Sequence, residues 1–201
     1  VATEETEENA PEPDPTAQEQ STEDSDDGQA DSPGRDEDPE EDAPDLTDLS
    51  DFDLDRETSE NWPGPASEPV YLTEIRSAAH DDVERIVFEH TGSPVPEYLV
   101  EYTDQAYVSE SGEEADVTGE AFLAVSVSGV MPPEDLDQVF SGHWGPDTPG
   151  TIFVDVFAQQ PFEAHATYYI GLNDEREFRV TVLEDPTRVV VDVHRIPVEA
   201  S

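Results

Sequence analysis

Apolar and polar residues alternate in short runs along the chain from Val70 onward. In RVVVDVHRI, residues 188–196, the period of two places Val189, Val191 and Val193 on one face of a strand, with Arg188, Val190 and Asp192 on the other. Seven further runs are rich in β-branched and aromatic residues: YLTEIRSAAH (71–80), ERIVFEH (84–90), YLVEYT (98–103), AFLAVSVSGV (121–130), TIFVDVFAQ (151–159), AHATYYIGL (164–172) and EFRVTVLE (177–184). Gly, Pro and Asp separate the runs, so the pattern predicts an all-β fold, a two-sheet β-sandwich of about eight to nine mostly antiparallel strands.

Helical spacing occurs in only two places. PPEDLDQVF, residues 132–140, has prolines followed by acids and predicts one short helical turn. In DLTDLSDFDLD, residues 45–55, Leu46, Leu49 and Phe52 are spaced to form one face of a short helix. Two interpretations of this second segment stay open: a disordered stretch with transient helicity, or a short linear motif that docks on the domain or on a partner.

Composition divides the chain into a tail and a domain. Residues 1–61 contain 25 carboxylates, two arginines and one aromatic residue, Phe52. So few apolar groups cannot offset chain entropy, and we expect residues 1–61 to be a disordered acidic linker. The prolines at 63, 65 and 69 mark the boundary, and residues 62–201 are long enough for one β-sandwich domain.

The formal net charge of −44 restricts the possible partners. Phosphate backbones and anionic lipid surfaces repel such a chain, so we expect neither nucleic-acid binding nor direct electrostatic membrane binding. All eight basic residues are arginine, and this excess of carboxylates favours an extracellular or high-salt setting where ions screen the self-repulsion. No cysteine is present, which excludes disulfides, and no apolar run is long enough to span a bilayer.

No pattern of catalytic or metal-binding residues is visible. The acidic clusters do not match a calcium-binding loop. The five histidines are not at metal-ligand spacings: His80, His90, His143, His165 and His194. The chain also contains neither a GxSxG elbow nor a glycine-rich phosphate loop. We therefore expect no metal, no cofactor and no enzymatic activity.

Two of the predicted strands have similar sequences. Arg85-Ile-Val-Phe-Glu89 and Arg188-Val-Val-Val-Asp192 both read arginine, three apolar residues, acid, and each follows an acidic turn. Within one strand the arginine and the acid are about 13 Å apart, too far to pair. We therefore expect each charge to meet an opposite charge on a neighbouring strand.

These segments resemble a known family. YLTEIRSAAHDDVERIVFEHTG, GTIFVDVFAQQPFEAHATYYIGLNDEREFRV and EFRVTVLEDPTRVVVDVHR together resemble the AMIN-like domain of secreted actinobacterial proteins and lipoproteins. That family is similar to the AMIN domain of cell-wall amidases and pilus secretins, and the likeness covers residues 70–196. The resemblance implies an exported, non-catalytic β-sandwich at the cell envelope. It also implies lipid anchoring through a cysteine, which would have to lie upstream of Val1.

Two functions follow as expectations. In the first, the domain is a binding module for cell-wall polymer (peptidoglycan) or an envelope protein, with the acidic tail as a spacer. Its candidate ligand-binding residues are the scarce cations and two aromatics: Arg76, Arg85, Arg179, Arg188, Trp144 and Tyr168. Cross-strand pairing of Arg85 and Arg188, and core filling by the aromatics, are the alternative uses of these side chains. In the second function, the tail and residues 45–55 bind a basic protein.

Overall fold

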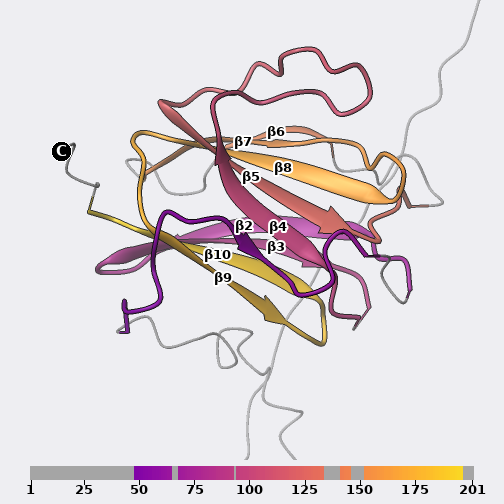
Figure 1. Ribbon diagram of the computed structural model, residues 1–201, viewed down its shortest axis with the longest axis horizontal. Helices are drawn as coiled ribbons and strands as arrows, with labels where there is room; N and C mark the ends of the chain where they lie inside the picture. The colour runs from indigo at the N-terminus through magenta and orange to yellow at the C-terminus, as the bar shows by residue number, and fades with distance from the viewer. Residues whose placement is uncertain (1–47, 65–67, 93, 134–140, 146–151, 197–201) are drawn as a thin grey trace, which may run out of the picture. The chain divides into compact units, whose positions relative to one another are not determined.

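In the part of the chain that the structure describes, ten β-strands form two stacked antiparallel sheets (Figure 1). The computed structural model describes residues 48–64, 68–92, 94–133, 141–145 and 152–196. The six-stranded sheet has the order β1 (Glu57–Thr58), β4 (Tyr98–Thr103), β5 (Ala121–Ser128), β8 (His165–Leu172), β7 (Phe153–Ala158), β6 (Gly142–Trp144). The four-stranded sheet has the order β2 (Leu72–Ala79), β3 (Val83–His90), β10 (Arg188–His194), β9 (Phe178–Leu183).

The predicted all-β sandwich is confirmed, and the eight predicted strands match observed strands to within two residues at each end. The structure adds two short strands that sequence reasoning missed, β1 and β6, each of which extends an edge of the six-stranded sheet. The described residues contain no helix, and therefore no helix long and apolar enough to cross a membrane. The helical turn predicted in 132–140 lies largely outside the described residues, because residues 134–140 are not described.

Alternating valines from the central strands build the core. Val189, Val191 and Val193 of β10 face the six-stranded sheet and are fully buried, as the period of two predicts. β10 lies between β3 and β9, so the last strand of the chain occupies the interior of its sheet. From the opposite sheet, β5 and β8 supply the facing layer: Leu123, Val125, Val127, Tyr168, Ile170 and Leu172.

One polar pair crosses the core between the two sheets. The rings of Phe88 and Tyr168 are stacked with centroids 4.6 Å apart. Nε2 of His90 and the hydroxyl of Tyr168 are hydrogen-bonded at 2.9 Å, and both residues are buried. Burial lowers the pKa of His90 to about 4 and raises the pKa of the Tyr168 phenol, because each charged form would lie away from water.

A long loop, residues 104–120, covers the outer face of the six-stranded sheet and lies at the top of Figure 1. Ala106 and Ala115 from this loop form a second small apolar cluster with Tyr169 of β8. The loop backbone approaches β8 so closely that a Cβ at Gly171 would lie 1.9 Å from the carbonyl oxygen of Thr118. A glycine is therefore required at this position.

The buried His90 makes stability depend on pH. Its folded-state pKa is about 4 and its ordinary value is 6.5, so between these values the unfolded chain binds a proton that the folded chain does not. Stability should therefore fall as pH falls, by about 2 kcal/mol between pH 7 and pH 5 from this residue alone. Urea unfolding in high salt at both pH values should show this loss in the wild type and not in His90→Gln.

The exposed His143 provides the matched control. His143→Gln leaves His90 in place and should therefore still show the loss of stability that the burial of His90 causes. If wild type and His90→Gln lost the same stability between pH 7 and pH 5, the account of His90 would be wrong.

Candidate functional site

All four candidate arginines lie on one face of the four-stranded sheet. Strand pairing places Arg85 of β3 opposite Asp192 of β10, and Asp192 opposite Arg179 of β9. Arg188 lies opposite Glu89 at the other end of the same two central strands. Directly paired residues share a face of a sheet, and this face is turned away from the valine core. The sequence thus concentrates its scarce cations on a single surface, which we call the arginine face.

Asp192 is the centre of the arginine face. Its carboxylate accepts two hydrogen bonds from Arg85, from Nε at 2.6 Å and from Nη2 at 2.9 Å, and a third from Nη2 of Arg179 at 3.0 Å. The side chain is only 1% exposed, and Arg85 is buried as well. A carboxylate buried this deeply needs such charge-assisted bonds to offset its lost hydration.

The sequence similarity between β3 and β10 has a physical explanation. Residues 85–89 and 188–192 are antiparallel neighbours in register, so each arginine lies opposite the other segment's acid. The prediction that these charges pair across strands is confirmed for Arg85 and Asp192. At the other end Glu89 pairs with Arg76 of β2 at 2.8 Å, while Arg188 donates to the backbone carbonyls of Glu184 and Pro186.

A segment N-terminal to the predicted domain packs against this face. We call residues 48–58 the strap. Its Phe52 is 7% exposed, and the Arg179 guanidinium lies 4.7 Å from the centre of the Phe52 ring, a cation–π contact. Arg179 also donates to the backbone oxygen of Asp48 at 3.1 Å. The helical face expected in 45–55 does not form in the described residues 48–55. They make a turn, in which the Phe52 N–H donates to the Leu49 carbonyl at 3.4 Å, and only Phe52 is deeply buried.

The strap also joins the two sheets along one open side. Asp53 forms a two-bond backbone bridge with Phe178 at the start of β9, and β1 pairs with β4 of the other sheet. The carboxylate of Glu57 accepts the backbone N–H of Val180 at 2.8 Å, and burial raises its pKa. Residues 48–58 were expected to belong to the tail, whereas they cover the otherwise unpaired edge of β9. Few apolar residues were needed for this, since backbone hydrogen bonds and one aromatic ring supply most of the contacts.

The two aromatic candidates are not brought together with the arginines. Tyr168 is buried between the sheets, where it stacks on Phe88. Trp144 belongs to β6, where it lies opposite Val156 and packs partly against the core. Among the six candidates, Arg76 and Trp144 have side chains that a ligand can still reach. The Arg76 side chain is 30% exposed, and Trp144 is half-buried.

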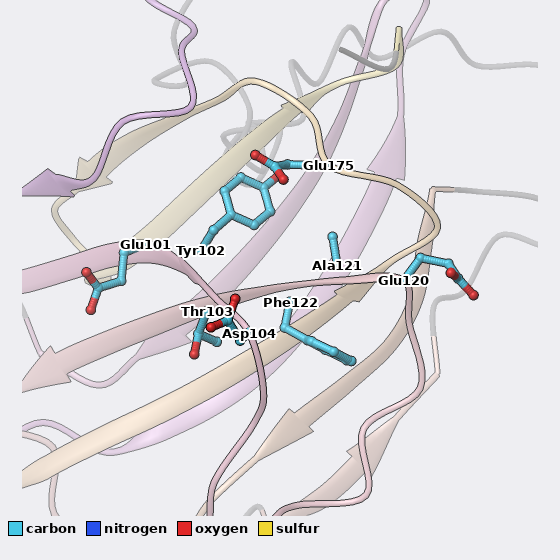
Figure 2. Close-up of a pocket in the computed structure, with 8 residues that line it drawn as sticks. All are labelled: Glu101, Tyr102, Thr103, Asp104, Glu120, Ala121, Phe122 and Glu175. Atoms are coloured by element: carbon cyan, nitrogen blue, oxygen red, sulfur yellow. The ribbon is translucent and has the colours of Figure 1, made fainter. Parts of the chain in front are cut away.

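An acidic cleft of about 500 Å³ lies at one end of the six-stranded sheet (Figure 2). β4 and the residue after it, the start of β5 and the β8–β9 loop contribute the lining: Glu101, Tyr102, Thr103, Asp104, Glu120, Ala121, Phe122 and Glu175. Figure 2 shows the carboxylates of Glu101, Glu120 and Glu175 pointing in different directions. The Tyr102 hydroxyl is engaged with the backbone of Arg176. The cleft offers negative charge and the aromatic rings of Tyr102 and Phe122, which suits a cationic partner.

The described residues contain no group of three His, Asp or Glu side chains that could hold a metal ion. Nδ1 of the exposed His143 lies 2.9 Å from the largely buried carboxylate of Asp155. Asp155 also accepts the backbone N–H of Thr118, so this pair ties β6 and β7 to the loop that covers their sheet.

Comparison with known proteins identifies the domain. The family model of the AMIN-like domain matches residues 70–195, from the start of the first long strand to the end of β10. The chain belongs to the AMIN-like domain family. No curated protein and no solved structure matches it.

The AMIN-like match indicates a non-catalytic module of cell-wall-associated proteins. It covers both central strands of the arginine face and begins after the strap, which is therefore an addition to the matched domain in this chain. Sequence reasoning missed the acidic cleft. Its residues come from three separate segments, so no local pattern in the sequence points to them.

The strap should contribute to the stability of this AMIN-like domain. Phe52→Ala should lower the free energy of unfolding by about 3 kcal/mol, because it removes a buried ring and the contact with Arg179. Urea unfolding monitored by circular dichroism measures the loss. Leu49→Ala, at a half-buried strap position, is the control and should cost less than Phe52→Ala. Equal stability of Phe52→Ala and wild type would contradict the docking of the strap.

Proposed function

We propose that the chain is a non-catalytic module of the cell envelope that attaches to, or localises at, the cell wall. The support is family membership together with the state of the arginines. Acidic residues N-terminal to the strap would serve as the spacer between the domain and its point of attachment. Peptidoglycan is the polymer that the family relationship favours.

The buried arginines argue against an electrostatic mode of attachment. Arg85 and Arg179 are both paired with the Asp192 carboxylate, and a ligand anion would have to compete with these bonds. Arg76 is already paired with Glu74 and Glu89. With a net charge of −44, the chain should also repel anionic wall polymers at long range. We therefore propose that attachment depends on neutral contacts, for which Trp144 is the sequence-predicted candidate that a ligand can still reach. Arg76 is also partly exposed, but its charge is paired with carboxylates.

A basic protein partner is the second candidate function, and the acidic cleft favours it. Four carboxylates line that cleft: Glu101, Asp104, Glu120 and Glu175. The strap part of the 45–55 segment is held on the arginine face, so the cleft and the acidic residues before the strap are the surfaces proposed for a basic partner.

Co-sedimentation of the full chain with purified peptidoglycan tests the first proposal. We expect the chain to pellet with the polymer at 50 mM and at 1 M salt, about equally or better in high salt, because screening removes repulsion and neutral contacts are unaffected. Capture of a basic protein should show the reverse dependence, falling steeply as salt rises. The full chain is used because the strap is part of the folded domain.

A chain that stays in the supernatant at both salt concentrations would overturn wall attachment. Retention that is lost in high salt would contradict the neutral mode and indicate electrostatic attachment to the polymer. A folded control of similar charge, such as a polyglutamate-tagged unrelated domain, should not sediment.

A further inference from the structure

A second cleft, of about 380 Å³, opens where β5 ends and β8 begins. We call it the hairpin cleft, because the turn between β7 and β8 forms one wall. Its described lining combines apolar groups with a few polar ones: Pro63, Glu68, Pro69, Ser128, Gly129, Met131, Glu163, Ala164 and His165. A volume of this size accommodates a small ligand or a single sugar ring.

The floor of the hairpin cleft is a rigid, hydrogen-bonded backbone. Gly129 donates to the carbonyl of Ala164 at 2.7 Å and accepts from the N–H of Val70 at 2.9 Å. Met131 donates to the carbonyl of Val70 at 2.9 Å, and Ser128 donates from its backbone to Glu97. These backbone groups are already satisfied, so a ligand would find its hydrogen bonds among the side chains.

Ser128 supplies an unused side-chain hydroxyl. The residue is 1% exposed, it lines the cleft, and its Oγ has no hydrogen-bond partner in the part of the chain that the structure describes. The equivalent hydroxyl two residues earlier, on Ser126, is hydrogen-bonded to Thr167. A buried hydroxyl without a partner is costly, and a ligand that bonds to it would relieve that cost.

His165 lies directly opposite Ser128 in the sheet and adds a second polar group. Its Nδ1 is 2.9 Å from the carbonyl oxygen of Glu163, so Nδ1–H donates and leaves Nε2 as an acceptor in the neutral ring. The rings of Trp62 and His165 pack in a T-shaped arrangement, with centroids 5.8 Å apart. The orientation of the imidazole is therefore set by two contacts.

The turn that forms the wall is strained. Glu163 and Ala164 have φ angles of 50° and 61°, a conformation that a two-residue hairpin turn normally assigns to Asn and Gly. Each such residue costs on the order of 1 kcal/mol. In this conformation the Glu163 carbonyl accepts from Nδ1 of His165, and the Ala164 carbonyl accepts from the N–H of Gly129. These two hydrogen bonds fix His165 and Gly129, which form the two sides of the cleft.

Charge and polarity limit the ligand. The described lining contains no cation, and Glu68 and Glu163 are exposed carboxylates, so an anionic ligand would be repelled. Prolines, Met131 and Ala164 offer apolar surface, while Ser128 and His165 offer few, fixed polar contacts. An N-acetylated sugar fits this combination, since its acetamido methyl suits the apolar wall, its amide suits the Ser128 hydroxyl, and its ring hydroxyls suit the carboxylates.

We propose that the hairpin cleft binds a neutral, N-acetylated hexosamine ring of a glycan strand. This inference rests on the proposed wall attachment and assigns it a site and a ligand class. Binding through neutral groups also agrees with a four-stranded sheet whose arginines are engaged within the fold.

Titration of the ¹⁵N-labelled full chain with chitotetraose, a β-1,4-linked N-acetylglucosamine tetramer, tests the site by NMR. Resonance shifts should concentrate at the amides of Ser128, Gly129, Met131, Ala164 and His165. Cellotetraose, which lacks the acetamido groups, should bind at least about fivefold more weakly because it cannot bond the buried hydroxyl in the same way. Shifts with tetralysine in place of chitotetraose would overturn the proposal and identify a cationic peptide site.

Substitution of the buried hydroxyl provides the sharper test. Ser128→Ala should weaken chitotetraose binding by about five- to tenfold and should raise the urea midpoint, because it removes an unsatisfied buried group. Ser77→Ala is the matched control: Ser77 of β2 also has a buried, unpartnered Oγ, and it does not line the cleft. It should raise the urea midpoint in the same way and leave binding unchanged.

Unchanged binding by Ser128→Ala, or equal loss in both variants, would overturn the assignment. A wild-type chain that sediments with peptidoglycan and ignores chitotetraose would refute the cleft and leave wall attachment standing. A chain that binds neither would refute both.

Discussion

The buried carboxylate of Asp192, held between Arg85 and Arg179, is the interaction on which the rest of the structure depends. It joins three of the four strands in one sheet and defines which residues of β3, β10 and β9 lie opposite one another. A slip of one residue would move Asp192 into the valine core and the valines onto the charged face. The charged face and the apolar core therefore specify the same register, and each supports the other.

This use of the cations has a consequence for function. The chain carries 52 carboxylates and eight arginines, and the arginines of the described sheet are engaged within the fold. The strap also occupies one of these arginines, because the Phe52 ring and the Asp48 carbonyl both contact Arg179. A module built in this way has little positive charge to offer a polyanion. The two clefts described above are lined by carboxylates and uncharged groups without an arginine, which is why recognition of a neutral glycan accords better with the fold than recognition of an anionic polymer.

Much of the fold was predictable from the sequence, and the reason is the period of two. Runs such as Val189, Val191 and Val193 alternate with charges, which sets both the strand and its buried face. β1 and β6 escaped prediction because strands of two and three residues are too short to show a period. The strap escaped because its single deeply buried side chain, Phe52, lies among acids that satisfy the composition of a disordered tail.

The candidate sites were harder to predict than the fold. Arginine and aromatic residues were selected for their chemistry, but burial decides whether a ligand can reach them, and Tyr168 and Arg85 are inside. The pairing of Arg85 with Asp192 was foreseeable, since charges on adjacent strands must find partners. The two clefts were not, because each gathers residues from distant segments and depends on how turns close rather than on any local motif.

A double-mutant cycle on Arg85 and Asp192 tests most directly the claim that the cations hold the sheet. Arg85→Met and Asp192→Leu should each lower the free energy of unfolding by about 3 to 5 kcal/mol, because the first leaves the buried Asp192 with Arg179 alone and the second leaves the buried Arg85 without its carboxylate. The double variant should cost less than the sum of the two, with a coupling energy of at least about 2 kcal/mol. Losses that add to within about 0.5 kcal/mol would contradict the account.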